Sequence, residues 1–534
     1  MWVRYAWAMH VDTRTLLFLS VIAGLSSCKG KAEKPDKQEP SPEKANVEHS
    51  SPTPATAAVL TPVPSSFLSE EQRKSLTGTE ALVTREYVEA FAATHTSLDW
   101  YGFYMAGRKV GFASVESRKT RGDEPGDYLM ELNIEMSADG ADMQFGEASY
   151  YESTFPFATV AIRSYEASAT GRVEREYVPE GDATRVRQVI DGKPAADLWA
   201  PAICETLASA LAATAPDVKT AKVGSVSRHC GFSDGELKQE VTETRVVSMG
   251  TRRIGGVEIQ VVTTEERSSP GDPWIAAITT EHGTLLEASV GPALELKLED
   301  MKVAKSDVVG IDIISASVKL DASLGDPSDI KKLQLRAVFV EGFEPPPSAP
   351  NQKAEKQADG SYLLTMESVP GALVDAEARA EALLSTADIT ANDPGILAMA
   401  TDLTKDAKDV KEKVAILNHW VYSNLDKSLS TNLSTASQIL EHKTGDCTEH
   451  TVLLLALLRS LKIPARELSG LVYMGPELSA FGWHAWTEVE IDGHWVQVDP
   501  SWDEVVGNAT HIRLGVGDSD SGMMNLGSMT LEAI

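Results

Sequence analysis

The first half of the chain alternates between apolar and polar residues with a period of two, which is the pattern of half-buried β-strands. Residues 100–105 and 110–115 are two such runs, and the Gly-containing segment 106–109 between them predicts a β-hairpin. Similar runs predict strands at 128–136, 146–151, 173–177, 185–190, 243–248, 257–264 and 274–279. The pattern therefore predicts an antiparallel β-rich domain over residues 67–320, with a helix at 204–211 and with aromatic residues such as Tyr150 and Tyr151 in its core.

The last part of the chain changes to helical spacing. Apolar residues recur on one face of 409–425, a second short helix is expected at 435–440, and residues 452–458 are apolar on all sides. Residues 484–491 and 494–500 then alternate as two strands around Asp492-Gly493, a strong signal for a tight hairpin turn. We therefore expect an α+β fold, in which a proline-containing connector at 321–374 joins the β-rich domain to a domain of helices and antiparallel strands at 375–534.

Length and charge restrict the classes of protein to consider. The chain has 534 residues, too many for one hydrophobic core, so more than one domain is expected. Its net charge of -29 argues against binding to nucleic acid, because phosphate binding requires a basic surface. A solvated acidic surface accounts for this charge without any partner.

The first residues have the organisation of an export signal. Two arginines precede a short apolar stretch at 16–25, too short to span a bilayer, and Leu25-Ser26-Ser27-Cys28 follows. These residues resemble the lipobox of bacterial lipoproteins, which implies a signal peptide at 1–27 and lipid attachment to Cys28. An ordinary secretory signal with an incidental cysteine is the alternative. By the same resemblance, Lys29 implies the outer membrane, facing the periplasm. Residues 28–66 have the composition of a disordered, Pro-rich linker.

Export to an oxidising compartment changes how the four cysteines are interpreted. Cys28 would carry the lipid. Cys204 and Cys230 lie close in the sequence of one domain and could form a disulfide, a hypothesis that the sequence leaves open. Cys447 then remains as a lone thiol, which in such a compartment is either used or buried.

Cys447 stands at the predicted start of the apolar helix. Asp446 is a good N-cap and Glu449 follows three residues later, as in a capping box, which places Cys447 at the first helical position. There the backbone N–H groups and the positive end of the helix dipole favour thiolate over thiol. The alternative is that Cys447 is a small buried apolar residue.

The predicted hairpin supplies a histidine and an acid to go with this cysteine. If Ile491 pairs with His494, then His484 and Asp499 are diagonal neighbours on one face, about 7–8 Å apart at Cα and within reach of a side-chain hydrogen bond. The other face, with Val489 and its neighbours, is expected to pack inward. The order Cys447, His484, Asp499 provides a nucleophile, a base and an orienting acid for acyl transfer.

Other residues near this trio are expected to serve as walls or supports. The backbone N–H of Cys447 is one candidate oxyanion donor, and a second donor is not identifiable. The residues expected to line a cleft, or to be structural, are Trp420, His450, Tyr473, Trp483 and Trp486. No calcium loop and no zinc spacing is recognisable, so no cofactor or metal is expected.

The segments that carry these residues resemble the transglutaminase-like superfamily, and its bacterial members in particular. They are Gly445-Asp446-Cys447, Ile463-Pro464-Ala465-Arg466, His484-Ala485-Trp486 and Asp499-Pro500, within residues 410–505. The resemblance implies a papain-like core, with the cysteine helix packed on an antiparallel sheet, and places the family's triad on Cys447, His484 and Asp499. It also implies an enzyme acting on amide bonds of proteins or peptides through a cysteine acyl-enzyme.

The resemblance leaves the reaction open. Hydrolysis is favoured over crosslinking, because water is always available and no lysine-binding feature is visible. A non-catalytic binding or assembly module of the cell envelope is the alternative, and a third interpretation assigns the function to the β-rich domain. The expected partners are a protein or peptide substrate and, through the lipid anchor, the membrane; the oligomeric state is not predicted.

Overall fold

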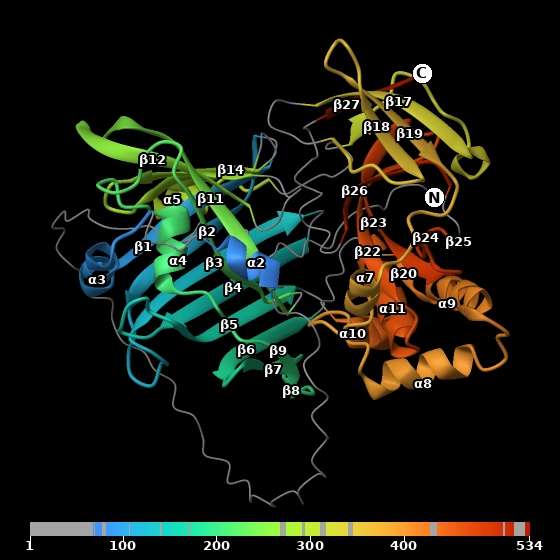
Figure 1. The fold of residues 1–534 in the computed structure, drawn as a ribbon, viewed down its shortest axis with the longest axis horizontal. Helices are drawn as coiled ribbons and strands as arrows, with labels where there is room; N and C mark the ends of the chain where they lie inside the picture. Colours follow the sequence, from blue (N-terminus) through green and yellow to red (C-terminus); the bar gives the residue numbers. More distant parts are fainter. Residues whose placement is uncertain are drawn as a thin grey trace, which may run out of the picture.

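The computed structural model (Figure 1) describes residues 68, 70–76, 82–105, 107–138, 141–168, 171–235, 237–267, 274–290, 294–309, 317–339, 345–427, 435–505, 508–516 and 529–534. The expected signal peptide, Cys28 and the linker at 28–66 lie outside these residues. Within the described ranges, no helix is both long and apolar enough to cross a membrane.

The N-terminal part is built on one large antiparallel sheet, in which most strands pair with their neighbours in sequence. The order runs β10 to β15, continues through the pair of β15 and β1, and ends with β1 to β8, while β9 pairs with β7. The strands are β1 (Ser97–Met105), β2 (Arg108–Lys119), β3 (Tyr128–Ala138), β4 (Ala141–Tyr151), β5 (Thr159–Ser168), β6 (Arg172–Glu180), β7 (Ala183–Ile190), β8 (Lys193–Pro194), β9 (Leu198–Pro201), β10 (Val226–Ser233), β11 (Lys238–Ile254), β12 (Val257–Arg267), β13 (Ile275–Thr280), β14 (Leu285–Val290) and β15 (Leu294–Glu299).

Alternation explains why these segments are strands with one face in a core. In β3 the residues at every second position from Tyr128 to Met136 are buried. They pack in one cluster with residues of the helices α3 (Arg85–Thr94) and α4 (Leu207–Thr214). The remaining helices of this part are α2 (Glu70–Ser75) and α5 (Met301–Ala304). Tyr150 and Tyr151 are each 5% exposed, which confirms their assignment to the core.

The expected antiparallel meander is confirmed, but several of its boundaries were wrong. The first hairpin is present, with Met105 opposite Arg108. The helix expected at 204–211 begins only at Leu207, because Thr206 is the N-cap and forms a capping box with Ser209. Strands β5, β8, β9, β10, β14 and β15 were not predicted. Of these, β15 alternates leucine with charged residues and was recognisable, whereas β8 and β9 are too short, at 2 and 4 residues, to show a period.

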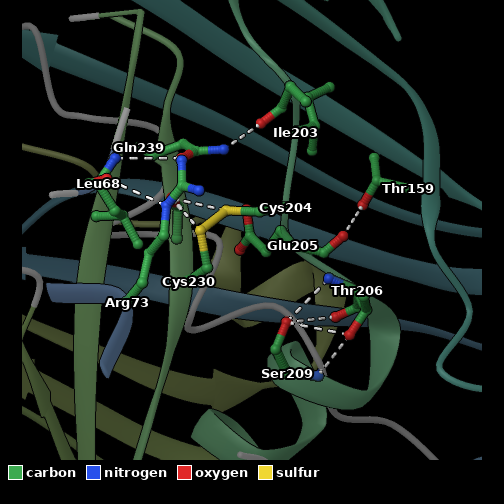
Figure 2. Close-up of a disulfide and its surroundings, with 12 residues drawn as sticks. Leu68, Arg73, Thr159, Ile203, Cys204, Glu205, Thr206, Ser209, Cys230 and Gln239 are labelled. Atoms are coloured by element: carbon green, nitrogen blue, oxygen red, sulfur yellow. Dashed lines mark hydrogen bonds between the residues drawn. A yellow bond between two sulfur atoms is a disulfide. The ribbon is translucent and has the colours of Figure 1, made fainter. Parts of the chain in front are cut away.

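A disulfide ties the start of α4 to the sheet (Figure 2). It joins Cys204 to Cys230 of β10, with the Cα atoms 5.7 Å apart. Beside it, the Gln239 side chain accepts a hydrogen bond from the Leu68 backbone N–H and donates one to the Ala202 carbonyl. Among the described cysteines, Cys447 is the one left as a thiol.

The C-terminal part combines helices with a second antiparallel sheet, of order β25-β24-β23-β22-β26, in which β16 also pairs with β23. Its elements are β16 (Val318–Lys319), a 3-10 turn (Pro327–Asp329), α7 (Ala376–Glu381), α8 (Pro394–Leu403), α9 (Val410–Asn424), β20 (Asp426–Lys427), α10 (Ala436–His442), β21 (Thr444–Gly445), α11 (Cys447–Ser460), β22 (Ala465–Tyr473), β23 (Ala480–Ile491), β24 (His494–Asp499), β25 (Glu504–Val505) and β26 (His511–Val516).

The expectation of a connector at 321–374 was wrong. This segment contains β17 (Lys332–Phe339), β18 (Gln352–Lys356) and β19 (Tyr362–Glu367), which form a small sheet with β27 (Met529–Ala533). The prolines at 345–347 lie before β18 and do not interrupt a strand. The last strand of this sheet comes from the end of the chain, a long-range pairing that no local pattern indicates.

Helix α11 is the centre of the helical core of the C-terminal part. Its residues from Val452 to Leu458 are all buried, and they pack against α8, α9 and α10 on one side. On the other side they meet the inner face of the hairpin β23–β24, formed by Val489, Ile491, Val496 and Val498. The inward direction expected for this hairpin face is therefore confirmed, and the first residue of α11 is held by both layers.

The two parts of the chain contact each other beside α10. Arg175 of β6 is buried and forms ion pairs with Glu166, at 2.6 Å, and with Asp388, at 2.5 Å. Gln438 of α10 donates a hydrogen bond to Asp191 at 3.0 Å. Helix α10 ends at His442, a few residues before Cys447. The contact of α10 with the large sheet therefore helps to fix the segment that leads into α11.

Candidate active site

Helix α11 begins at Cys447, as the sequence predicts. The Asp446 carboxylate accepts from the Thr448 N–H at 2.8 Å, and the Glu449 carboxylate accepts from the Asp446 N–H at 2.8 Å, which completes the expected capping box. Gly445 is needed before this turn, because a Cβ there would lie 2.3 Å from the Cβ of Glu449. The thiol is thus fixed at the first turn of a buried helix, with its side chain partly exposed.

The hairpin β23–β24 has the register that the sequence predicts. Ile491 pairs with His494, and the ladder extends to Thr487 opposite Val498. Asp492 and Gly493 both have positive φ, at 52° and 79°, as a tight hairpin turn of this type requires. In this register the His484 Nε2 atom lies 2.7 Å from the Asp499 Oδ2 atom, and both side chains are buried.

Asp499 accepts hydrogen bonds from three groups. Its Oδ2 atom is bonded by His484 and also by the Nε2 atom of His511 at 3.1 Å, while its Oδ1 atom accepts from the Ser501 N–H at 2.7 Å. Burial alone would raise the pKa of Asp499, but the charge of His484 and the hydrogen bonds from both histidines hold it well below its usual range. Asp499 is therefore ionised at neutral pH.

The His484 ring lies between two indoles. It stacks on Trp502 with centroids 5.2 Å apart and 16° between the planes, and on Trp486 at 5.9 Å and 13°. Indole faces attract cations, so this arrangement stabilises an imidazolium at position 484. With Nε2 engaged by Asp499, the other ring nitrogen, Nδ1, is the one left to exchange a proton with a thiol.

The Cys447 sulfur accepts a hydrogen bond from the backbone N–H of Ala485, the residue after His484 on β23. Burial, followed by the charge of Asp446, raises the pKa of the Cys447 thiol well above its ordinary value, and the Ala485 N–H opposes this only in part. The expectation that the helix start favours thiolate was therefore wrong for the resting site. The charges of Asp446, Glu449 and Asp499 add to the effect of burial and raise the thiol pKa further.

Two further polar side chains belong to the surroundings of the site. His450 is fully buried, and its Nδ1 atom lies 2.5 Å from the Asp446 carbonyl oxygen, so it holds the helix start. Burial lowers the pKa of His450 to about 4, which keeps the ring neutral at pH 7. Lys427 donates to the Ser501 carbonyl at 2.7 Å, and its backbone pairs with Gly445. Burial lowers the pKa of Lys427, and the charge of Asp499 opposes that shift.

The other residues expected near a cleft divide into two groups. Trp486 is fully buried and contacts the His484 ring, so it is a wall of the site. Tyr473 is buried away from the trio: its hydroxyl accepts from the Leu324 N–H at 3.0 Å. Trp483 packs against a core cluster that includes Leu471 and Phe481 of the C-terminal sheet, and Trp420 packs against the helical core around α11. The structure therefore gives Tyr473 and Trp420 structural contacts.

Three residues that touch the site were missed by sequence reasoning, namely Lys427, Trp502 and His511. Trp502 is three residues after Asp499, and its nearness in sequence is a signal that could have been used. His511 comes from β26, which pairs with β22 and not with either strand of the hairpin. Lys427 comes from the short pair β20–β21. The sequence around His511 and the sequence around Lys427 contain no local pattern that places either residue near Asp499.

A known protein family matches the segment that contains α11 and the hairpin β23–β24. Residues 397–500 match the family model described as "Transglutaminase-like superfamily". No curated protein matches the chain.

Two solved structures are similar to parts of the chain. One is described as a candidate cysteine protease from Cytophaga hutchinsonii; it is 16% identical, with 39% of this chain and 87% of that chain covered and a TM-score of 0.27. The other is described as a candidate protease from Parabacteroides distasonis ATCC 8503; it is 13% identical, with 65% and 69% covered and a TM-score of 0.17.

Proposed function

We propose that this chain, whose residues 397–500 match the model of the transglutaminase-like superfamily, is a thiol enzyme that acts on amide bonds through an acyl-enzyme on Cys447. One observation carries this proposal. Helix α11, which begins at Cys447, packs on β23, where the Ala485 N–H faces the sulfur and the neighbouring His484 ring is bonded to the buried carboxylate of Asp499 at 2.7 Å. Nucleophile, base and orienting acid thus come together from a helix start and one hairpin.

The proposed reaction has two halves. In the first, the Cys447 sulfur bonds to the amide carbonyl carbon while the thiol proton moves to Nδ1 of His484. The C–N bond then breaks, His484 gives its proton to the leaving amine, and a thioester remains. In the second, an acceptor attacks the thioester carbon, its proton moves to His484, the C–S bond breaks and the thiol takes that proton back.

The surroundings of His484 support this proton transfer. The resting thiol is protonated, since burial raises its pKa, so a base has to act during the attack. The imidazolium formed in that step is stabilised by ionised Asp499 and by the faces of Trp502 and Trp486. The three groups therefore favour the charged state of His484 that the reaction creates.

We propose a protein or peptide as the substrate and water as the acceptor. Incubation of the full chain with casein and dansylcadaverine separates this from crosslinking. The expected result is new casein N-termini that are absent with Cys447→Ala, together with little dansyl label on casein. Dansyl incorporation without new termini would identify a transamidase instead.

A non-catalytic binding or assembly module of the cell envelope is the second candidate. The raised pKa of the Cys447 thiol favours it, because an unreactive thiol is what a module without chemistry would tolerate. The dependence of Cys447 alkylation on His484, described in the Discussion, separates the two candidates.

We also propose that the protein is exported and anchored by lipid on Cys28, in the outer membrane facing the periplasm. The support is the sequence Leu25-Ser26-Ser27-Cys28 after a short apolar stretch. In a bacterial host, an alkyne fatty acid is expected to label the wild-type chain and not Cys28→Ser, which should be found in the soluble periplasmic fraction. Equal labelling of both chains would refute the anchor at this position.

A further inference from the structure

His511 stands at a position that the proposed triad does not require. It is the first residue of β26, pairs with Val472 of β22 and is 3% exposed. Its Nε2 atom lies 3.1 Å from the same Asp499 Oδ2 atom that His484 bonds at 2.7 Å. Two imidazoles from different parts of the sheet thus converge on one oxygen of one buried carboxylate.

The hydrogen bonds assign the proton on the His511 ring. An ionised carboxylate is an acceptor only, so Nε2 of His511 must carry a proton to bond Asp499. The Nδ1 atom of His511 is buried, and the described residues offer it no hydrogen-bond partner. An unpaired lone pair there is tolerated better than a buried N–H without an acceptor. The ring is therefore the neutral tautomer with its proton on Nε2.

The surroundings of the His511 ring weigh against a metal ion between His484, Asp499 and His511. The ligand atoms of His484, Asp499 and His511 lie within 4.8 Å of one another, a spacing that a divalent cation could use. A histidine that ligates a metal through Nε2 has its proton on Nδ1 and gives it to an acceptor. Within the described part of the chain Nδ1 of His511 meets no such acceptor, so its environment fits a hydrogen-bond donor through Nε2 better than a metal ligand.

The ring of His511 also contacts both indoles that enclose His484. It meets Trp486 at 5.0 Å and 61°, and Trp502 at 5.8 Å and 65°, each edge to face. One side chain therefore contacts the acid and both indoles that stack on the base. This is the placement of a group that acts through its neighbours.

We propose that His511 is a positioning residue of the active site. Its Nε2–H fixes the Asp499 carboxylate so that Oδ2 stays directed at His484, and thereby keeps the His484 ring in the orientation that accepts the Cys447 proton. This inference rests on the proposed function, since positioning matters only if His484 is the base.

Two substitutions of similar size separate this role from simple packing. His511→Gln retains an N–H at the position of Nε2, whereas His511→Leu removes it, and both lose the ring contacts with Trp486 and Trp502. The readout is the rate of Cys447 alkylation by iodoacetamide at pH 7, measured on the full chain. We expect His511→Leu to be slower than wild type by roughly tenfold to a hundredfold, the usual effect of losing a hydrogen bond to a charged group. His511→Gln should stay close to wild type.

Other outcomes overturn the inference. Equal rates for the two variants, whether both slow or both unchanged, would show that the donor is irrelevant. A stoichiometric metal in the purified wild type that both variants lose would make His511 a ligand. If His484→Ala alkylates as fast as wild type, the proposed function itself fails, and that result is distinct from a failure of His511 alone.

A measurement on the unmodified chain covers the case in which the variants do not fold. Long-range ¹⁵N spectra of the wild type labelled at histidine report which nitrogen of each buried ring is protonated. Because His484 and His511 both bond Asp499 through Nε2, two buried rings protonated at Nε2 only are expected, with slow exchange of these protons with solvent. A proton on Nδ1 of His511 would contradict the inference.

Discussion

Replacing His484 by alanine is expected to slow alkylation of Cys447 by iodoacetamide at pH 7 by roughly two orders of magnitude, the lower range of what a positioned base contributes. The thiol of Cys447 is protonated at this pH, because burial and the charge of Asp446 raise its pKa. Attack on the reagent therefore needs a group that removes the proton. The hydrogen bond to Asp499 at 2.7 Å holds the His484 ring for that task.

The pH dependence of the Cys447 alkylation rate also tests whether His484 is the base. In the wild type His484 takes the thiol proton during the attack, so the rate should depend on pH less steeply than the rate of a thiol that has no base. In His484→Ala the rate should follow the thiolate alone, rising about tenfold per pH unit and continuing to rise beyond pH 9, because the thiol pKa is raised.

A histidine on the same hairpin provides the matched control. His494 begins β24 and its ring bonds the Asp492 carbonyl at 3.3 Å, away from Asp499. His494→Ala should alkylate like wild type across the whole range. If His494→Ala and His484→Ala behave alike, the assignment of His484 as the base is wrong.

Replacing Gly470 by alanine should destabilise the C-terminal domain and also slow the site. Gly470 of β22 is directly opposite His484, and a Cβ at this position would lie 2.0 Å from the Ile512 carbonyl oxygen on β26. Backbone cannot give way as a flexible side chain does, so β22 and β26 must separate. We expect a loss of roughly 2–3 kcal/mol in the free energy of unfolding, as for other overpacked sites.

Urea unfolding followed by tryptophan fluorescence, together with the alkylation rate, tests this prediction. Gly250→Ala is the control, because a Cβ at that position of β11 meets no atom within 4 Å. Its stability should remain within about 0.5 kcal/mol of wild type. Separation of β26 also moves His511 away from Asp499, so Gly470→Ala should alkylate more slowly even in the folded state. A stable Gly470→Ala with the wild-type rate would show that the strands can accommodate the methyl group.

The parts of the site that the sequence predicts are those set by local rules. Asp446 and Glu449 define the helix start through a capping box of four residues, and Asp492-Gly493 fixes the hairpin register. That register alone brings His484 to Asp499. The helix spacing of α9, which begins at Val410 after the N-cap Asp409, was recognisable for the same reason.

The parts that were missed depend on contacts between distant segments. β17 joins β27, which lies at the end of the chain, so residues 321–374 appeared to be a connector although they form a sheet. His511 reaches Asp499 through β22, a strand that pairs with both β23 and β26. Neither relation leaves a period or a turn signal in the sequence.

The prediction about the ionisation of the Cys447 thiol was also wrong. The helix start was expected to favour thiolate, yet burial and the charges of Asp446 and Glu449 raise the thiol pKa. The dipole effect is worth a fraction of a kcal/mol at an exposed helix end, whereas loss of solvent penalises the whole charge. Sequence reasoning could place Cys447 at the helix start but could not tell how deeply its surroundings would be buried.

The central claim, that Cys447 forms an acyl-enzyme, is tested most directly by mass spectrometry of the full chain quenched in acid after mixing with p-nitrophenyl acetate. The claim predicts one acetyl group on the Cys447 peptide, removed by hydroxylamine as expected for a thioester, and absent from His484→Ala at the same time point. Release of p-nitrophenol at equal rates by the wild type and Cys447→Ala, with no acetyl group on Cys447, would contradict it.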